Sequence, residues 1–279
     1  MISDITLGQF FPGYSPIHKL DPRTKLLFMV AFIVCIFLAS DIYAYVLLIG
    51  VTALSVAVSR VPVLMVLKGL KPIVFIVLFT AVLNLFWTSG QTVLASWTVI
   101  PNFWTIVIYK ESLINAGVLS LRILVLMACT SLYLSYTTTP IELTDGIETG
   151  LAPLKKIKVP VHEFAMMMTI ALRFIPTLVD ETTKIMNAQK ARGADFSSGG
   201  LIKRAKALIP IIIPLFVSSF RRADELATAM ECRCYHGGKG RTRMRVLKMK
   251  VKDYAFIVLT CGMIAGVILL NIYATGYKL

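Results

Sequence analysis

Residues 254–274 read YAFIVLTCGMIAGVILLNIYA, and this run contains no Lys, Arg, Asp or Glu. A helix of this length and apolarity can cross the ~30 Å hydrocarbon core of a bilayer. Similar apolar runs recur upstream, so the chain is predicted to be an all-α, polytopic membrane protein with about five spans. The upstream runs are residues 26–40, 44–59, 72–88 and 113–135.

The composition agrees with a protein that lies in the lipid bilayer. Of the 279 residues, 57% are hydrophobic, whereas an average soluble domain has about 45–50%. One oversized soluble core could also raise this fraction, but it would not need several uninterrupted runs of spanning length. We therefore expect a multi-pass membrane protein.

The positive charge is concentrated in one part of the chain. The formal net charge is +14, and residues 136–252 hold 20 of the 29 Lys and Arg. Basic segments stay on the cytoplasmic side of a membrane, so this segment and the basic N-terminus are predicted to be cytoplasmic. We predict a membrane domain of four spans over residues 1–135, a cytoplasmic helical module over 136–252, and a final span over 253–279.

Residues 89–111 have the opposite character. They contain Lys110 as their only base, and they include Trp97 and Trp104. Tryptophan is enriched at membrane–water interfaces. We predict that this segment is an external connection that follows the membrane surface.

The module is unusually apolar for a cytoplasmic segment. Its stretches 164–178 and 207–220 are long and hydrophobic, and they are interrupted by Pro176, Pro210 and Pro214. The first is rich in Met, whose flexible side chain adapts to irregular surfaces. The Met-rich stretch could equally pack inside the module or form an exposed docking face. Both apolar stretches are expected to be buried, either against the membrane or against a partner protein.

Two triplets of the form small-Arg-small are the most informative motif. Ala191-Arg192-Gly193 precedes the breaker-rich residues 197–200, and Cys232-Arg233-Cys234 precedes Gly237 and Gly238. Each is predicted to end a helix. Small neighbours let a helix end enter a groove, where the planar guanidinium can bind a carboxylate in a bidentate manner. Two such ends in parallel contexts suit two similar partners.

No segment has the pattern of a catalytic or metal site. Residues 237–242 contain Gly and Lys but lack the spacing of a phosphate-binding P-loop, and a basic loop after a helix is the preferred interpretation. Cys232, Cys234 and His236 lack the second ligand pair of a structural zinc site. We expect no catalytic residue, no metal and no cofactor held by the chain itself.

Two further features of the charge distribution bear on function. Arg122 lies in the fourth apolar run, where a charge is costly, and a structural partner such as a carbonyl group is favoured over a role in substrate binding. The bases of the module alternate with acids and lack aromatic stacking partners, so binding to nucleic acid or anionic lipid is not expected of it.

The chain resembles the transmembrane T component of energy-coupling factor (ECF) transporters, a CbiQ-like family, over nearly its whole length. The resemblance includes SPIHKLDPRTK at 15–25, TTP at 138–140 and LRFIP at 172–176. The resemblance is strongest in two segments: AQKARG at 188–193, and FRRADELA at 220–227, which continues to AMECRCY at 229–235. These motifs occur in order at family-like separations. In the family the second triplet commonly reads Ala-Arg-Gly, so the two cysteines beside Arg233 are a departure.

The resemblance implies a non-catalytic coupling subunit of an ABC-type importer in a bacterial plasma membrane. Two ATPase subunits would bind ATP and Mg, and each would hold one helix end in a groove. The implied ATPase-docking residues are Ala191, Arg192, Gly193, Cys232, Arg233 and Cys234. Apolar faces of the module would hold a small, substrate-binding S component, and the residues implied are Met166, Met167, Ile170, Leu208, Ile211 and Leu215.

The sequence is consistent with three functions. The N-terminal residues 12–16, PGYSP, resemble the shared vitamin-transporter type. A T subunit dedicated to cobalt or nickel uptake is the near alternative. An intramembrane enzyme that uses Arg122 or the Cys232–His236 cluster is the alternative from another class.

Overall fold

The computed structural model describes residues 10–87, 92–100, 104–196, 200–238 and 247–273. Contacts among them group into two compact units. The first, here called the membrane unit, contains residues 10–146 and 247–273, and the second, here called the coupling module, contains residues 147–238. The division therefore follows Gly146, whereas the sequence interpretation placed it after residue 135.

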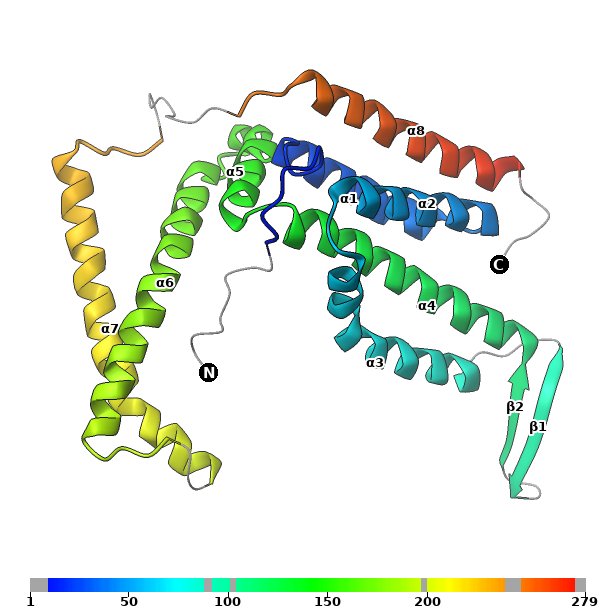
Figure 1. The fold of residues 1–279 in the computed structure, drawn as a ribbon, viewed down its shortest axis with the longest axis horizontal. Coiled ribbons are helices and arrows are strands. Elements are labelled where there is room, and N and C mark those ends of the chain that lie inside the picture. The colour runs from blue at the N-terminus through cyan, green and yellow to red at the C-terminus, as the bar shows by residue number, and fades with distance from the viewer. Residues whose placement is uncertain (1–9, 88–91, 101–103, 197–199, 239–246, 274–279) are drawn as a thin grey trace. The chain divides into compact units, whose positions relative to one another are not determined.

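The membrane unit is built almost entirely of helices, as Figure 1 shows. Among the described residues, four helices have the length and apolar composition to cross a membrane: α2, α3, α8, and α4 together with the π-helical turn η1. This confirms the all-α, polytopic fold. The elements are α1 Pro22–Leu38, α2 Ile42–Ser59, α3 Val63–Trp87, α4 Lys110–Thr130, η1 Ser131–Tyr136, α5 Pro140–Gly150 and α8 Val251–Tyr273.

The first predicted span, residues 26–40, corresponds to α1. This helix has 17 residues, which is at the lower limit for crossing a bilayer. Among the described helices, it also supplies the largest number of residues to the buried hydrophobic cluster of its unit. Eight of its residues are buried: Pro22, Thr24, Lys25, Phe28, Met29, Phe32, Cys35 and Ile36.

Two elements differ from the sequence interpretation. The third span was expected to begin at Pro72, but α3 begins at Val63 and contains Pro72 in its interior; Figure 1 shows α3 bending part-way along its length, as a proline inside a helix causes. The connection over 89–111 contains two antiparallel strands, β1 Val93–Ile100 and β2 Trp104–Tyr109. Residues 88–91 lie outside the described part.

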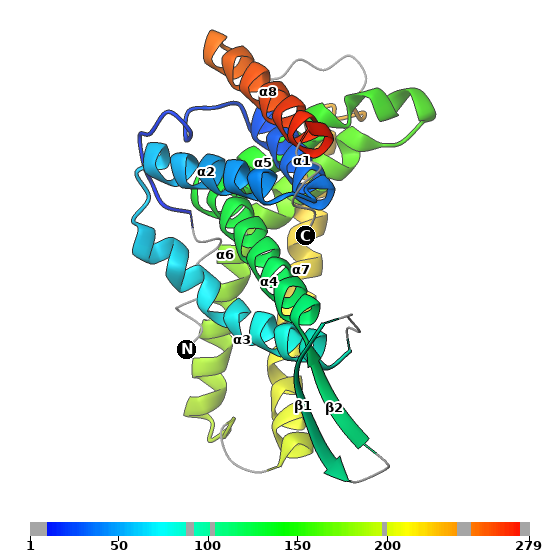
Figure 2. The ribbon, with the colours of Figure 1, turned by 90° about the vertical axis from the view of Figure 1, so that its right-hand side faces the viewer.

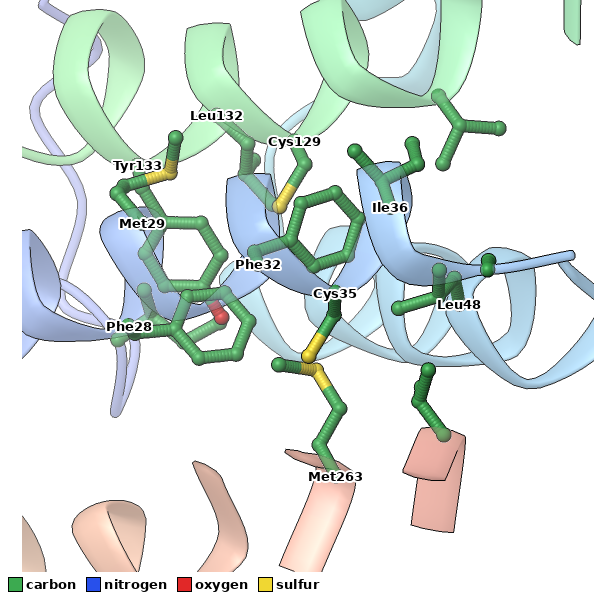
Figure 3. Packing of buried hydrophobic residues seen from close by; sticks show 14 of the residues in the cluster. Phe28, Met29, Phe32, Cys35, Ile36, Leu48, Cys129, Leu132, Tyr133 and Met263 are labelled. Atoms are coloured by element: carbon green, nitrogen blue, oxygen red, sulfur yellow. The ribbon is translucent and has the colours of Figure 1, made fainter. Parts of the chain in front are cut away.

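The core of the membrane unit forms where α1 packs against α4, η1 and α8. Figures 2 and 3 show these helices and the side chains between them. The Phe28 ring lies 4.7 Å from the ring of Tyr133 and 5.1 Å from that of Phe256, centroid to centroid. Tilted aromatic pairs at this distance stabilise a fold by more than the burial of their apolar area alone. Phe28 of α1 therefore joins η1 and α8 at one point.

Arg122 finds partners within the membrane unit. Its Nε donates to the Tyr45 hydroxyl at 2.9 Å, and its Nη2 donates to the same hydroxyl and, at 3.4 Å, to the carbonyl oxygen of Ala39. The guanidinium also lies over the rings of Phe37 and Tyr45. These contacts supply the structural partner that was predicted for this residue.

The first turns of α1 and α8 are joined by one buried carboxylate. Asp21 caps α1 by accepting from the Arg23 amide at 3.0 Å, and Pro22 follows at the first helical position, where proline is favoured. Asp253 accepts from the Asp21 amide at 2.8 Å and from the Lys250 amide at 2.7 Å. Asp253 thus caps α8 and holds the start of α1 beside it.

Lys25 joins the same corner to the end of η1. Its side chain is buried, and its ammonium donates to the Thr137 carbonyl oxygen at 2.7 Å and to the Thr138 hydroxyl at 3.1 Å. A buried charge requires such partners. The SPIHKLDPRTK and TTP motifs, more than 100 residues apart, therefore meet in one hydrogen-bonded cluster.

Replacing Asp253 with Asn tests this joint. An amide offers one oxygen where the carboxylate uses two, so one buried backbone N–H loses its acceptor, at a cost of about 1–3 kcal/mol. We expect Asp253→Asn to lower the unfolding temperature of the purified protein in mild detergent. Asp224→Asn, at an exposed position, is the matched control, and equal unfolding temperatures for the two variants would contradict the assignment.

Candidate functional site: two arginine-ended helices

The coupling module consists mainly of two long amphipathic helices that pack against each other. They are α6, Val161–Ala191, and α7, Leu201–Cys232, and a short 3-10 helix, η2 Ala152–Ile157, precedes α6. Figure 1 shows α6 and α7 lying together and α7 bending part-way. The prolines at 210 and 214 inside α7 account for the bend.

Two side-chain contacts and one shared cavity fix the relative orientation of α6 and α7. The Gln189 amide donates to the Pro210 carbonyl oxygen at 3.5 Å, and Arg222 pairs with Glu181 at 2.9 Å. Farther along, Thr169 and Met230 line the same cavity. As the residue number decreases along α6, the number of its partner residue on α7 increases. The two helices are therefore antiparallel, and their C-terminal ends lie at opposite ends of the pair.

Both helices end in the same backbone motif. At the end of α6, the Gly193 amide donates to the Lys190 oxygen at 2.9 Å and the Ala194 amide to the Gln189 oxygen at 3.0 Å. At the end of α7, the Cys234 amide donates to the Glu231 oxygen at 2.8 Å and the Tyr235 amide to the Met230 oxygen at 3.0 Å. This is the Schellman pattern of helix termination.

An arginine occupies the C-cap in each motif, as the two triplets predicted for helix ends. Arg192 has φ −87° and ψ 7°, and Arg233 has φ −92° and ψ 16°. Both residues are exposed. A cation at a helix C-terminus is favoured by the partial negative charge of the last carbonyl groups, so the guanidinium groups are stabilised where they project from the helix ends.

The cysteine after Arg233 adopts the conformation that glycine adopts after Arg192. Gly193 has φ +86° and Cys234 has φ +55°. The left-handed conformation costs an L-residue roughly 1–2 kcal/mol and costs glycine almost nothing. Cys234 therefore preserves the shape of the triplet, at an energetic cost that glycine would avoid.

Arg233 also lines a cavity of about 740 Å³ between α6 and the end of α7. Arg173 and His236 also line this cavity, together with Met166 and Ile170. Two guanidinium groups on one cavity favour an acidic ligand or an acidic side chain of a partner. Met166 and Ile170, which were expected to contact an S component, thus share this cavity with a residue expected to contact an ATPase.

The other residues expected to contact an S component are divided between exposed and buried positions. Met167 is 58% exposed and Leu208 is 43% exposed, whereas Ile211 is 3% exposed; Leu215 is half-buried. Other exposed apolar residues of α7 form a different set. They are spaced by three and four positions, so they lie on one face of the helix. These residues, here called the α7 stripe, are Ile209, Ile212, Ile213, Phe216, Val217 and Phe220.

The histidine of the candidate Cys232–His236 metal site binds its own backbone. His236 Nδ1 lies 2.9 Å from the carbonyl oxygen of Cys234. Among the described residues, no three His, Cys, Asp or Glu side chains are grouped so that they could hold a metal ion. Of the Gly- and Lys-containing loop at 237–242, residues 239–242 lie outside the described part.

A protein-family model places the chain among known proteins. The model described as cobalt transport protein, CbiQ, matches residues 13–244. The chain belongs to the CbiQ family. Both arginine-ended helices lie within the matched segment.

Relatives in the family refine this assignment. The chain is 55% identical to a protein of Clostridium kluyveri and 54% identical to one of Ruminiclostridium cellulolyticum. The alignments cover 95% of both chains in the first case, and 97% of this chain and 98% of the relative in the second. A protein of Bacillus subtilis is 48% identical over 92% of this chain and 95% of its own.

All three relatives bear the name energy-coupling factor transporter transmembrane protein EcfT. With similarity of this extent, the chain is a transmembrane component of an ECF transporter. The resemblance identified from the sequence motifs is confirmed.

The shape of the two triplets gives a direct test. Cys234→Gly removes the left-handed strain and should stabilise the end of α7 by about 1 kcal/mol, whereas Gly193→Ala should weaken the end of α6 by about the same amount. Amide hydrogen exchange in the last turn of each helix reports both changes. Gly200→Ala, where φ is −69° and an added Cβ meets no atom within 4 Å, should leave both ends unchanged.

Proposed function

We propose that the chain couples ATP hydrolysis in two separate ABC ATPase subunits to movement of a small, substrate-binding S component during micronutrient uptake. The chain itself carries no catalytic residue in this proposal, and ATP and Mg bind to the ATPases. The observation that supports it most is that both helices of one antiparallel pair end in the same hydrogen-bonded motif with an arginine at the C-cap.

The separation of the ends suits two partners. Arg233 lines a cavity with Thr169 of α6, and the 23 residues from Thr169 to Arg192 extend roughly 35 Å at 1.5 Å per residue. A single groove could not hold both ends at this separation. Two ATPase subunits, each with one groove that contains a carboxylate, would hold one arginine each.

The S component is proposed to bind the α7 stripe. Six large apolar side chains along one face of a helix are a surface that soluble proteins rarely leave uncovered. This face is opposite to Ile211, which is buried. A small membrane protein is the partner whose own surface is apolar enough to cover the stripe.

The orientation follows from charge. The coupling module and the N-terminus are proposed to face the cytoplasm of a bacterial cell, because the Lys and Arg of the chain are concentrated there. ATP and the ATPases are on that side. The segment with β1 and β2 would then be external.

Two alternatives are less well supported. A subunit dedicated to cobalt or nickel would agree with the description of the family model, but the relatives with the highest identity reported above bear the ECF name. An intramembrane enzyme based on Arg122 is disfavoured because that guanidinium already binds Tyr45 and Ala39. Identification of the membrane subunits that copurify would separate the vitamin and metal versions.

Substitution of both arginines tests the docking proposal. Truncation of one partner of a buried charge pair typically costs 2–5 kcal/mol of binding energy, so Arg192→Ala with Arg233→Ala should abolish copurification of the ATPases and uptake. Lysine at both positions should rescue poorly, because it lacks the bidentate fork. Membrane insertion should be normal.

The control for this experiment is Arg204→Ala with Arg221→Ala, which removes two exposed arginines of α7 that lie outside both triplets. This control should retain both ATPases. A double variant at 192 and 233 that still copurifies with both ATPases would refute the proposal.

A charge in the α7 stripe tests the second contact. Phe216 is 62% exposed, and Phe216→Asp should reduce S-component copurification at least tenfold, because a desolvated, unpaired carboxylate is costly in an apolar interface. ATPase binding should persist. Thr183→Asp adds the same charge at an exposed position of α6 and should change neither. Equal loss of the S component in both variants would argue against the stripe.

A further inference from the structure

The membrane unit contains a cleft between α2 and α8 that the proposed coupling function does not use. It has a volume of about 560 Å³, within the range of sites that bind small molecules. Leu47, Val51 and Val58 of α2 and Leu259 and Met263 of α8 form its walls. Phe28 and Tyr133 also line it.

The cleft is closed at one end and lined by a charge at the other. Near the C-terminal end of α8, a Cβ added at Gly266 would lie 3.3 Å from Leu47, so the two helices touch there. Asn271 farther along donates to the Leu38 carbonyl oxygen and accepts from Ser40. At the N-terminal end of α8, Lys252 is exposed, and it is the one charged residue among the described residues that line the cleft.

The wall of the cleft offers no hydroxyl hydrogen to a ligand. The Ser55 hydroxyl donates to the Val51 carbonyl oxygen at 2.7 Å, and it lies 2.9 Å from the Tyr133 hydroxyl, which can donate to it. Both protons are therefore used within the protein. A long apolar chain fits such a wall better than a polar solute, because it demands no hydrogen bond.

The length of the lined face matches one leaflet of a bilayer. Residues of α8 from Lys252 to Met263 line the cleft, and 11 steps of 1.5 Å give about 16 Å. Half of the ~30 Å hydrocarbon core is about 15 Å. Both helices have the length and composition of membrane spans, so an acyl chain of a surrounding lipid can enter from the side.

We propose that this cleft binds one anionic phospholipid, with an acyl chain between α2 and α8 and its phosphate at Lys252. The neighbouring Asp253 does not oppose the phosphate strongly, because both of its oxygens accept backbone N–H groups and it is 2% exposed. Anionic lipids are concentrated in the cytoplasmic leaflet, and the proposed orientation puts the start of α8 on that side.

Gly262 allows the cleft to be filled without disturbing the helix. It lines the cleft, and a Cβ added there meets no atom within 4 Å. Gly262→Leu should therefore occupy the volume and favour the helix, since leucine has a higher helix propensity than glycine. Gly50→Leu is the matched control, because Gly50 lies in α2, has no atom within 4 Å of an added Cβ, and is absent from the cleft lining.

The experiment measures lipid retained by the transporter complex. The complex would be purified from nanodiscs that contain equal amounts of phosphatidylglycerol and phosphatidylcholine, and bound lipid would be counted by native mass spectrometry. We expect the wild type and Gly50→Leu to retain one phosphatidylglycerol, about tenfold in preference to phosphatidylcholine. Lys252→Gln should reduce this preference to twofold or less, and Lys248→Ala, at an exposed position outside the cleft lining, should preserve it.

The Gly262→Leu variant, in which the cleft is filled, is the decisive test. Gly262→Leu should remove the retained lipid without lowering the unfolding temperature and without loss of a copurified subunit. Retention of the lipid by Gly262→Leu would overturn the proposal. Loss of a copurified membrane subunit, with the lipid still bound, would also overturn it, because the cleft would then belong to a protein partner. The ATPase-docking proposal would stand in either case.

Discussion

The hydrogen bonds that close the last turns of α6 and α7 are the constraint on which the proposed docking surface depends. Without them, the final carbonyl groups of each helix would need water, and the arginine would lie on a frayed turn. With them, Arg192 and Arg233 have nearly the same φ and ψ. The chain thus presents the same terminus twice, although the two triplets share only the arginine.

A second cluster holds the membrane unit together at one corner. Asp253 accepts the Asp21 amide, and Lys25 donates to Thr137 and Thr138. Three segments distant in sequence are therefore joined by charge-assisted hydrogen bonds, which are the stronger kind in a low-dielectric setting. The hydrogen bonds at this corner explain why α1 can be short, because its first turn is held by neighbouring segments as well as by its own helical hydrogen bonds.

The sequence predicted features that depend on local pattern and missed those that depend on packing. Apolar runs located the spans, and glycine near each arginine located the helix ends. The start of α3 was misplaced because proline usually stops a helix, whereas Pro72 is accommodated by a bend. The buried role of Lys25 and the inward position of Ile211 follow from contacts with other helices, which no local pattern contains.

The division of α7 into two faces explains how one helix could serve two kinds of partner. Ile211 is buried, and Arg222 pairs with Glu181 of α6, so this side of α7 is committed to α6. The α7 stripe points away from that contact, and Arg233 ends the same helix. A force applied at Arg233 reaches the stripe along α7 itself, whereas a force applied at Arg192 reaches it only if α6 and α7 move together. The hydrogen bond between Gln189 and Pro210 adds a second link between the two helices, near Arg192. Two links at separate heights resist rotation of one helix about the other, which one central contact could not do.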